Sequence, residues 1–286
     1  SEGFVGHNLV EGLSKTHEIF CADLITDSNH KNYKQFDITD SSSVDQIVRN
    51  VDVVIDLAAH SLVSSLDGSV ENAKVNIIGL LNVLESCRKN QIKKIIFTSA
   101  SSMIGVPNSE QVSEDHPAFP KTAYGITKLA SEHYLRLYNE LYGINFVVFR
   151  FFNIYGPYQK NGLIPTLYNR IKNGESLMVF GKGDQIRDYV FIEDIVSFFE
   201  EAILSDIGNN QIFNMGTGKG STISDIIKIL SKTLQISPTI ENKPERPGEI
   251  GNFVGDTTKL NSVFGSTPST SVTLGIQKTV EWLKKC

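Results

Sequence analysis

Short apolar runs alternate with long amphipathic segments through the first half of the chain, and this alternation limits the possible folds more than any other feature. The runs at residues 51–60, 94–99 and 144–152 are dominated by aliphatic and aromatic side chains, as expected of strands buried in a parallel sheet. Residues 70–90 and 124–142 carry apolar positions at helical spacing. This order of strands and helices predicts an α/β fold built on a doubly wound parallel sheet.

The chain starts with a glycine pattern that is typical of a nucleotide-binding turn. Gly3 and Gly6 have the spacing of the last two glycines of such a turn, and Phe4 and Val5 lie between them at the start of a helix. The first glycine of the pattern and a buried strand are expected immediately upstream, but the numbering begins at Ser1. We therefore expect that the first strand of the sheet is absent from the numbered chain. An ordinary helix start with incidental glycines is the alternative.

Two acidic residues end predicted strands that follow this turn. Asp23, next to Leu24, lies roughly 20 residues beyond the glycines, where an acid accepts hydrogen bonds from an adenosine ribose and repels a 2′-phosphate. This position favours NAD over NADP. Asp37, before Ile38, would face the adenine edge, and a helix cap is an equally weighted alternative because Asp40 precedes an amphipathic run.

Tyr124 and Lys128 are the strongest candidates for proton transfer. They are four residues apart in a predicted helix, so their side chains share one face. An ammonium group beside a phenol stabilises the phenolate, which lets a tyrosine exchange protons near neutral pH despite an ordinary pKa of about 10. The 94–99 strand ends in the hydroxyl residues Thr98 and Ser99. Together these groups suit the movement of a proton on or off a sugar hydroxyl while hydride leaves the same carbon.

The composition argues against several other classes of protein. The 286 residues carry a net charge of −5 without a basic block, so neither nucleic acid nor an anionic membrane is expected as a partner. Cys21, Cys87 and Cys286 are far apart and lack metal-type spacing. We expect reduced thiols, no metal site and a cytoplasmic protein. No apolar run reaches the 18 or so residues that a membrane span requires.

The second half of the chain has shorter predicted elements and a looser alternation. Helices are expected at residues 163–173, 195–204, 222–234 and 275–285, with strands at 177–180, 188–192 and 212–215. The breaks between them are rich in Gly, Asn and Pro and indicate turns. We therefore divide the chain into a cofactor-binding domain at residues 1–152 and a smaller α/β substrate-binding lobe at residues 153–286, with some interleaving of segments.

Seven short blocks occur in an order that is typical of one protein family. They are Gly3-Phe-Val-Gly6, Leu57-Ala-Ala-His60, Thr98 to Gly105, Tyr124-Gly-Ile-Thr-Lys128, Arg150-Phe-Phe-Asn-Ile-Tyr-Gly-Pro157, Gln185 to Asp194, and Arg246-Pro-Gly-Glu249. From Ser1 to about Lys285 the chain thus resembles the extended short-chain dehydrogenase/reductase family, and within it the NAD-dependent nucleotide-sugar epimerase/dehydratase branch. The resemblance implies a Rossmann-type sheet that holds NAD tightly and a smaller lobe that binds a nucleotide-diphosphate sugar.

The resemblance also implies which residues contact the cofactor. The expected NAD contacts are Gly3, Phe4, Val5, Gly6, Asp23, Leu24, Asp37, Ile38, Leu57, Ala58, Ala59, His60, Asn76, Thr98, Ser99, Tyr124, Lys128 and Phe151. Within this set, Lys128 is expected to lower the pKa of Tyr124 and to donate a hydrogen bond to the nicotinamide ribose.

The substrate contacts carried over from the family lie mainly in the second half. They are Asn153 for the diphosphate-sugar, Leu163 in the segment that closes over the nucleotide, Phe180 where the backbone meets uracil, Arg187 and Arg246 for the diphosphate, and Glu249 for the nucleoside ribose. In the first half, Ser101, Ser102 and Tyr124 are further expected substrate contacts. Guanidinium groups suit paired phosphate oxygens. The alternatives are an ion pair of Arg187 with Asp188 and a solvated loop around Arg246.

The loop after the 94–99 strand separates the chemistries of this branch. Dehydratases and decarboxylases of the family usually carry an acid shortly after the catalytic hydroxyl, where this chain has Ser101 and Ser102. We therefore expect a 4-epimerase. Tyr124 would take the proton of the sugar 4-OH while C4 passes hydride to NAD, and hydride would return to the opposite face of a 4-keto sugar.

The same loop departs from the family at two positions. The residue that aligns with the catalytic Ser or Thr is Ala100, and the usual Tyr before the glycine is Ile104. Loss of one proton-transfer group typically costs about 10²–10⁴-fold in rate. Three hypotheses stay open: Ser99 or Ser101 takes over the role, Tyr124 acts on the substrate alone in a slower enzyme, or the protein binds its ligands without efficient turnover.

Two further expectations concern the sugar and the assembly. Phe253 matches a position beside the sugar C2 substituent and favours UDP-glucose and UDP-galactose over the N-acetylated sugars, and a core position in the lobe is an equally weighted alternative. Residues 70–90 and 124–142 carry wide apolar faces, through which family members pair, so a homodimer is expected. The alternative functions are a dehydratase or oxidoreductase of the same family and a non-enzymatic NAD-binding regulator or scaffold.

Overall fold

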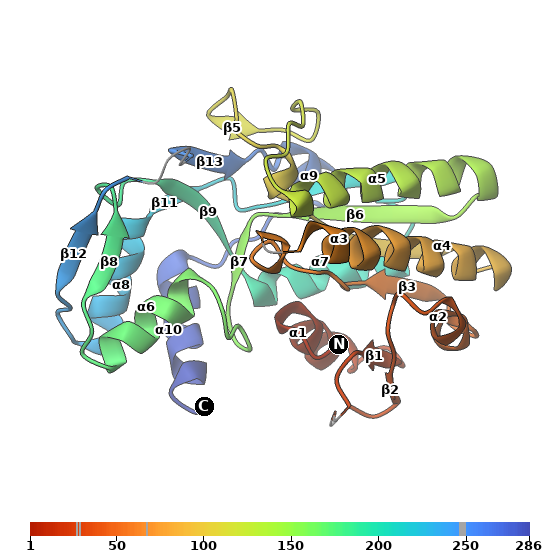
Figure 1. Ribbon diagram of the computed structural model, residues 1–286, viewed down its shortest axis with the longest axis horizontal. Coiled ribbons are helices and arrows are strands. Elements are labelled where there is room, and N and C mark those ends of the chain that lie inside the picture. Colours follow the sequence, from red (N-terminus) through yellow and green to blue (C-terminus); the bar gives the residue numbers. More distant parts are fainter. Residues whose placement is uncertain (27, 29, 67, 246–249) are drawn as a thin grey trace.

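A parallel sheet built mainly from the first half of the chain has helices on both faces (Figure 1). The computed structural model describes residues 1–26, 28, 30–66, 68–245 and 250–286. Four parallel strands have the order β10-β6-β4-β3. Their bounds are β3 (Val53–Asp56), β4 (Lys94–Ala100), β6 (Asn145–Phe151) and β10 (Gln211–Met215). The predicted doubly wound parallel α/β fold is confirmed.

A second parallel pair lies near the start of the chain. It consists of β1 (Cys21–Asp23) and β2 (Tyr33–Gln35), in a register that pairs Cys21 with Tyr33. Both strands are shorter than the sequence pattern indicates. Asp23 ends β1, so its carboxylate lies at the carboxyl edge of this pair.

Helices cover the two faces of the first sheet (Figure 1). On one face lie α3 (Ser69–Ala73), the π-helix η2 (Lys74–Gly79), α4 (Leu80–Lys89) and α5 (Ala123–Tyr142), with α2 (Ser41–Val48) against α4; on the other lie α1 (Phe4–Leu13) and α7 (Ile192–Leu204). The single helix predicted at residues 70–90 is thus interrupted by a π-helical segment. Short 3₁₀ turns occur at η1 (Ser64–Leu66) and η3 (Ser101–Met103). No helix in the described part of the chain is both long enough and apolar enough to cross a bilayer.

Side chains of the first sheet alternate between two hydrophobic cores, as the strand period requires. Ile96 packs in the core that also contains Phe199 of α7. Its neighbour Phe97 packs on the opposite side with Leu84 of α4 and Leu135 of α5. Because both sides of β4 are covered, every residue of this strand is buried.

The described part of the smaller lobe contains short strands and four further helices. One sheet has the order β11-β9-β13-β5 with β7 beside β9, and β12 pairs with β8. The strands are β5 (Gln111–Val112), β7 (Asn153–Tyr155), β8 (Leu177–Phe180), β9 (Ile186–Phe191), β11 (Gly220–Thr222), β12 (Ile240–Lys243) and β13 (Asn252–Gly255), and the helices are α6 (Leu163–Lys172), α8 (Ile223–Leu234), α9 (Thr258–Phe264) and α10 (Val272–Leu283).

Segments from the two halves of the sequence cross between these sheets. β10 pairs with β6 from Gln211 opposite Val147 to Met215 opposite Phe151, so it completes the first sheet although it lies late in the chain. In the other direction, β5 pairs with β13 in the smaller lobe. The two halves therefore share strands.

Candidate active site

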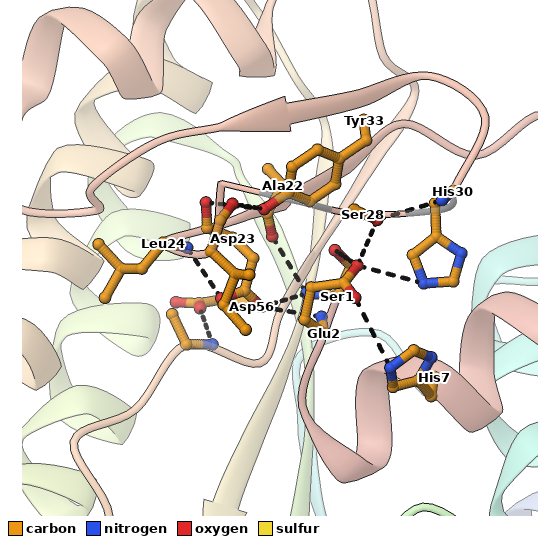
Figure 2. A network of polar contacts seen from close by, with 12 residues as sticks. Ser1, Glu2, His7, Ala22, Asp23, Leu24, Ser28, His30, Tyr33 and Asp56 are labelled. Atoms are coloured by element: carbon orange, nitrogen blue, oxygen red, sulfur yellow. Dashed lines mark hydrogen bonds and ion pairs between the residues drawn. The ribbon is translucent and has the colours of Figure 1, made fainter.

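The glycine turn leads directly into α1 and is tied to the end of β1. Gly3 is the N-cap of α1, and an added Cβ there would meet open space. Gly6 is buried, and a Cβ there would lie 2.4 Å from the carbonyl oxygen of Ser1. The Asp23 carboxylate accepts hydrogen bonds from the backbone N–H groups of Glu2 (2.9 Å) and Leu24 (2.8 Å) (Figure 2). An open helix N-terminus beside a fixed carboxylate suits a dinucleotide.

The residues after β2 form a turn before α2. The Asp37 carboxylate accepts hydrogen bonds from the N–H and hydroxyl groups of Thr39 (2.8 and 2.7 Å). The N-cap of α2 is Asp40, which accepts from the Ser42 N–H group (3.0 Å). Asp37 is exposed and Ile38 is buried, and the adenine contact of Asp37 stays a prediction.

Asn76 connects the end of β3 to α5. Its Oδ1 accepts a hydrogen bond from the His60 N–H group (2.7 Å), and its Nδ2 donates to the Thr127 hydroxyl (3.0 Å). Asn76 lies in the π-helix η2, where the wider turn changes the direction of its side chain relative to a regular helix. Leu57, Ala58 and Ala59 precede His60, so the segment beside this network has mostly small or partly exposed side chains.

Lys128 is fully buried on α5 beneath the end of β4. Its Nζ donates a hydrogen bond to the Thr98 carbonyl oxygen (2.7 Å) and lies 4.5 Å from the centre of the Phe97 ring. Burial lowers the pKa of Lys128 to about 8, against the opposing effects of Asp56 and Glu132. A buried ammonium group with a reduced pKa is a marker of functional sites.

Tyr124 lies in the first turn of α5, and its surroundings differ from the expectation. Burial raises the pKa of Tyr124 to about 12. The Lys128 Nζ lies 5.7 Å from the centre of the Tyr124 ring and is directed to the Thr98 carbonyl. The expected lowering of the tyrosine pKa by Lys128 is therefore wrong for the protein without its ligands, because desolvation is the effect that acts on the phenol.

Close packing brings α5 against the loop that follows β4. The Thr122 hydroxyl caps α5 by accepting from the Gly125 N–H group (3.1 Å). A Cβ at Gly125 would lie 2.9 Å from the Ser102 carbonyl oxygen, so this contact requires glycine. The helix start that carries Tyr124 thus lies directly beside residues 101–103.

The hydroxyl groups of this loop have different surroundings. Ser99 donates to the Met103 Sδ (3.9 Å), and Ala100, at the end of β4, is buried opposite Phe151. Ser101 is also buried. The Ser102 Oγ is buried and has no hydrogen-bond partner among the residues that the structure describes. Unpaired buried polar atoms of this kind call for a water or a ligand.

Ile104 has a structural role in this loop. Its side chain is fully buried in the core that contains Phe149 and Phe199. The family tyrosine at this position is thus replaced by a core residue.

A cavity of about 400 Å³ opens in the smaller lobe and contains three of the predicted substrate contacts. Asn153 on β7, Leu163 at the start of α6 and Arg187 on β9 all line it. Sequence reasoning missed other lining residues, among them Gln159 and Tyr189, because no local pattern distinguishes them.

The remaining predicted substrate contacts have separate positions. Phe180 ends β8, and its carbonyl oxygen accepts from Gln185 Nε2 (2.8 Å). Phe253 is buried and packs against Phe152, which lines the cavity, with ring centres 5.4 Å apart. Arg246 and Glu249 lie outside the described residues.

Asp188 holds three backbone segments together in the lobe. It accepts hydrogen bonds from the N–H groups of Thr217 (2.8 Å), Gly218 (3.1 Å) and Gly255 (3.2 Å). Its side chain is fully buried. Arg187, its neighbour, donates to the Ile186 carbonyl oxygen (2.9 Å) and lines the cavity.

Comparison with known proteins gives one family along most of the chain. The model of the NAD dependent epimerase/dehydratase family matches residues 1–216. The UDP-glucose 4-epimerase of Mycolicibacterium smegmatis is 29% identical over 301 residues, which cover 99% of this chain and 96% of that protein.

Solved structures with similar folds include two kinds of epimerase. The UDP-glucose 4-epimerase of Thermotoga maritima with UDP-glucose has a TM-score of 0.91 and 30% identity, covering 99% of this chain and 96% of that one. The UDP-N-acetylglucosamine 4-epimerase of Methanobrevibacter ruminantium, in complex with UDP-N-acetylmuramic acid, has a TM-score of 0.92 and 28% identity with the same coverage.

Proposed function

Because the chain belongs to the NAD dependent epimerase/dehydratase family, we propose that it is a UDP-hexose 4-epimerase with UDP-glucose and UDP-galactose as its preferred pair. The observation that carries the choice of epimerase is the loop after β4. Ser101 and Ser102 stand there, where dehydratases of the family usually have an acid, and this loop lies directly beside the start of α5. The loop thus lacks a carboxyl group for eliminating water from the sugar.

The proposed reaction needs a base at the sugar 4-OH and an acceptor for the C4 hydride. NAD, when bound, supplies the hydride acceptor and a positively charged nicotinamide ring. Tyr124 takes the 4-OH proton and returns it after the 4-keto sugar has turned. Since burial raises the pKa of Tyr124 to about 12, its proton must be removed with help from a nearby cation. Lys128, 5.7 Å from the ring centre, is the side chain placed to give that help.

The nucleotide half of the substrate belongs in the cavity of the smaller lobe. Arg187 and Asn153 offer polar donors to a diphosphate, and Leu163 offers an apolar wall. In this proposal residues 1–152 bind NAD and residues 153–286 bind the UDP-sugar, with Arg246 and Glu249 as further contacts. A substrate of this type and the three free cysteines fit a cytoplasmic enzyme.

A product assay tests the proposal. The protein is incubated with NAD and UDP-galactose, and the nucleotide sugars are separated. We expect UDP-glucose to form without net NADH, because hydride returns to the sugar in each turnover. Accumulation of NADH would support an oxidoreductase, and a 4-keto-6-deoxy product would support a dehydratase.

A second candidate function is NAD and sugar-nucleotide binding without efficient turnover. Ala100 favours it, because an alanine at the end of β4 cannot relay a proton. Calorimetric binding of UDP-glucose together with no product of any kind would select this function over the epimerase.

The preference for unacetylated sugars rests on Phe253. This residue packs on Phe152 at the cavity wall, so it would limit room near the sugar if the substrate reaches that wall. Competitive binding of UDP-glucose against UDP-N-acetylglucosamine measures the preference. Equal affinity for the two sugars would remove Phe253 from the argument.

We further propose a homodimer formed through the helices that cover one face of the first sheet. Large apolar side chains on these helices are exposed, among them Val70, Ile78, Ile126, Leu137 and Leu141. Their exposure matches a helix-to-helix interface between two copies. Light scattering of the native protein and of Leu141→Glu tests it, with a lower mass expected for the variant.

A further inference from the structure

Three side chains with metal-binding groups gather beside the glycine turn (Figure 2). Glu2 comes from the turn, His7 from α1 and His30 from the segment between β1 and β2. One ligand atom of each lies within 4.8 Å of the other two. Among the described residues this is the one group of three such side chains with this geometry.

The distances within this cluster suit a shared ion better than direct hydrogen bonds. His30 Nε2 lies 3.4 Å from Glu2 Oε1, and His7 Nε2 lies 3.6 Å from Glu2 Oε2. A separation of 3.6 Å is too long for a hydrogen bond. Zinc–ligand bonds of 2.0–2.1 Å in a tetrahedral site place neighbouring ligand atoms about 3.3 Å apart. Each of the two imidazole–carboxylate separations is close to that value, and one ligand atom of each residue lies within 4.8 Å of the others.

All three side chains are largely buried, and one of them has a ring nitrogen without a hydrogen-bond partner among the described residues. The side chains of Glu2 and His30 are only 9% and 19% exposed, and that of His7 is 29% exposed. The His30 Nε2 atom is buried and has no hydrogen-bond partner in the described part of the chain. A buried carboxylate facing an unpartnered imidazole nitrogen is costly unless a proton or a cation joins them.

Neighbouring groups contact the side chains of Glu2 and His7 and the backbone of His30. The Ser28 hydroxyl donates to Glu2 Oε1 (2.6 Å) and accepts from the backbone N–H group of His30 (3.1 Å). The His7 ring stacks on Tyr158 with centres 4.7 Å apart. Such supporting contacts are typical of metal sites.

We propose that Glu2, His7 and His30 bind one divalent transition-metal ion of the zinc class, with water completing a tetrahedral shell. Two imidazoles and one carboxylate form a ligand set that zinc accepts, whereas magnesium and calcium prefer oxygen ligands. The Glu2 N–H group also binds Asp23, so the ion would join the glycine turn, α1 and the segment after β1. Its role is therefore structural, at the edge of the region that holds the cofactor.

Zinc titration of the metal-free chain tests the site. The tag-free protein is treated with a chelator, dialysed and titrated with zinc chloride by calorimetry at pH 7.5, in a Cys286→Ser background because this thiol is exposed. We expect one ion per chain, a higher melting temperature with zinc, and the visible absorption of tetrahedral cobalt when cobalt replaces zinc. Magnesium should produce none of these effects.

Variants separate this site from other histidines. His30→Ala and Glu2→Gln should each weaken zinc binding by more than about 100-fold, and Ser28→Ala, which removes a supporting contact, by about 10-fold. His17→Ala is the matched control, because His17 Nε2 lies 3.8 Å from Glu200 without a third ligand among the described residues. It should bind zinc like the parent protein.

Three results would overturn the proposal. They are the absence of stoichiometric zinc binding to the parent protein, unchanged binding after both His30→Ala and Glu2→Gln, and an equal loss in His17→Ala. The zinc titration of the parent protein needs no variant, so it can refute the proposal even if a variant fails to fold. Circular dichroism of each variant confirms that it is folded before titration.

Discussion

Arg150 and Lys128 are two buried cations at helix α5, and they differ in whether a carboxylate pairs with them. Arg150 on β6 donates to both carboxylate oxygens of Glu132 on α5 (2.9 and 2.8 Å) and to the Glu114 carbonyl oxygen (2.7 Å). Lys128, one turn before Glu132 on α5, donates to the Thr98 carbonyl, and no carboxylate in the described residues lies within ion-pair distance. The comparison teaches that a paired buried charge supports the fold, whereas an unpaired buried cation with a lowered pKa is a candidate for a functional role.

The largest expected effect comes from the phenol beside Lys128. Tyr124→Phe removes the proposed base, so turnover of UDP-galactose should fall by about 10⁴-fold, at the upper end for a proton-transfer group. Its free energy of unfolding should change little. Tyr134→Phe, on the same helix, is the control and should retain activity in the same product assay. An active Tyr124→Phe protein would exclude Tyr124 from the mechanism.

Breaking the ion pair of Arg150 with Glu132 should instead lower the stability of the fold. Glu132→Gln leaves the Arg150 guanidinium buried without its counter-charge, so the free energy of unfolding should fall by about 3–5 kcal/mol. Urea denaturation measures this change. Arg49→Met, which breaks the exposed pair with Asp45, is the comparison and should cost less than about 1 kcal/mol. Equal losses in the two variants would contradict a special role for the buried pair.

Removing the unpaired cation should stabilise the protein. Burial lowers the pKa of Lys128 from 10.5 to about 8, so the folded state takes up its proton less readily than the unfolded chain. Above pH 10.5 the amine is neutral in both states, so the free-energy cost of burying the ammonium vanishes. This cost grows as pH falls towards 8 and is constant below pH 8. Lys128→Met should therefore raise the free energy of unfolding by about 3 kcal/mol at pH 7.

Urea denaturation of Lys128→Met at several pH values gives the sign of this change in the free energy of unfolding. The gain over the parent protein should shrink between pH 8 and pH 10.5, and activity should be lost at every pH. A variant that is less stable than the parent at pH 7 would show that the ammonium is well compensated in the ligand-free protein.

The smallest expected effect concerns the missing hydroxyl beside these charges. Ala100→Ser should raise the turnover rate by about 100-fold, at the lower end for a restored proton-transfer group. Ala100→Val adds volume without a hydroxyl and should not raise it. If Ser replacement changes nothing, a hydroxyl at position 100 does not limit the reaction.

The sequence predicts the central sheet well because its signals are local. The apolar run of β4 and the helical spacing of α5 need no knowledge of distant residues. The π-helical segment around Asn76 was not predicted, because no residue type or spacing in residues 70–90 distinguishes it from a regular helix. β5 and β7 have only two or three residues each and show no pattern at all.

The residues of the candidate site likewise differ in whether local sequence or distant contacts reveal them. Tyr124 and Lys128 are recognisable because they lie four residues apart on one helix. Two other groupings depend on contacts between separate elements: the ion pair of Arg150 with Glu132 and the cluster of Glu2 with His30. In neither grouping does the sequence separation of the residues have a distinctive value. The contact of Lys128 with the Thr98 carbonyl and the burial that raises the pKa of Tyr124 are likewise properties of the folded chain.

The position of β10 has a consequence for how the protein is made. An outer strand of the first sheet comes from residues Gln211–Met215, so a ribosome must synthesise the first part of the lobe, residues 153–210, before that sheet has its last strand. Until then β6 presents an apolar, unpaired edge, which is prone to association with other chains. Completion of the sheet therefore waits for a pairing across more than sixty residues of sequence.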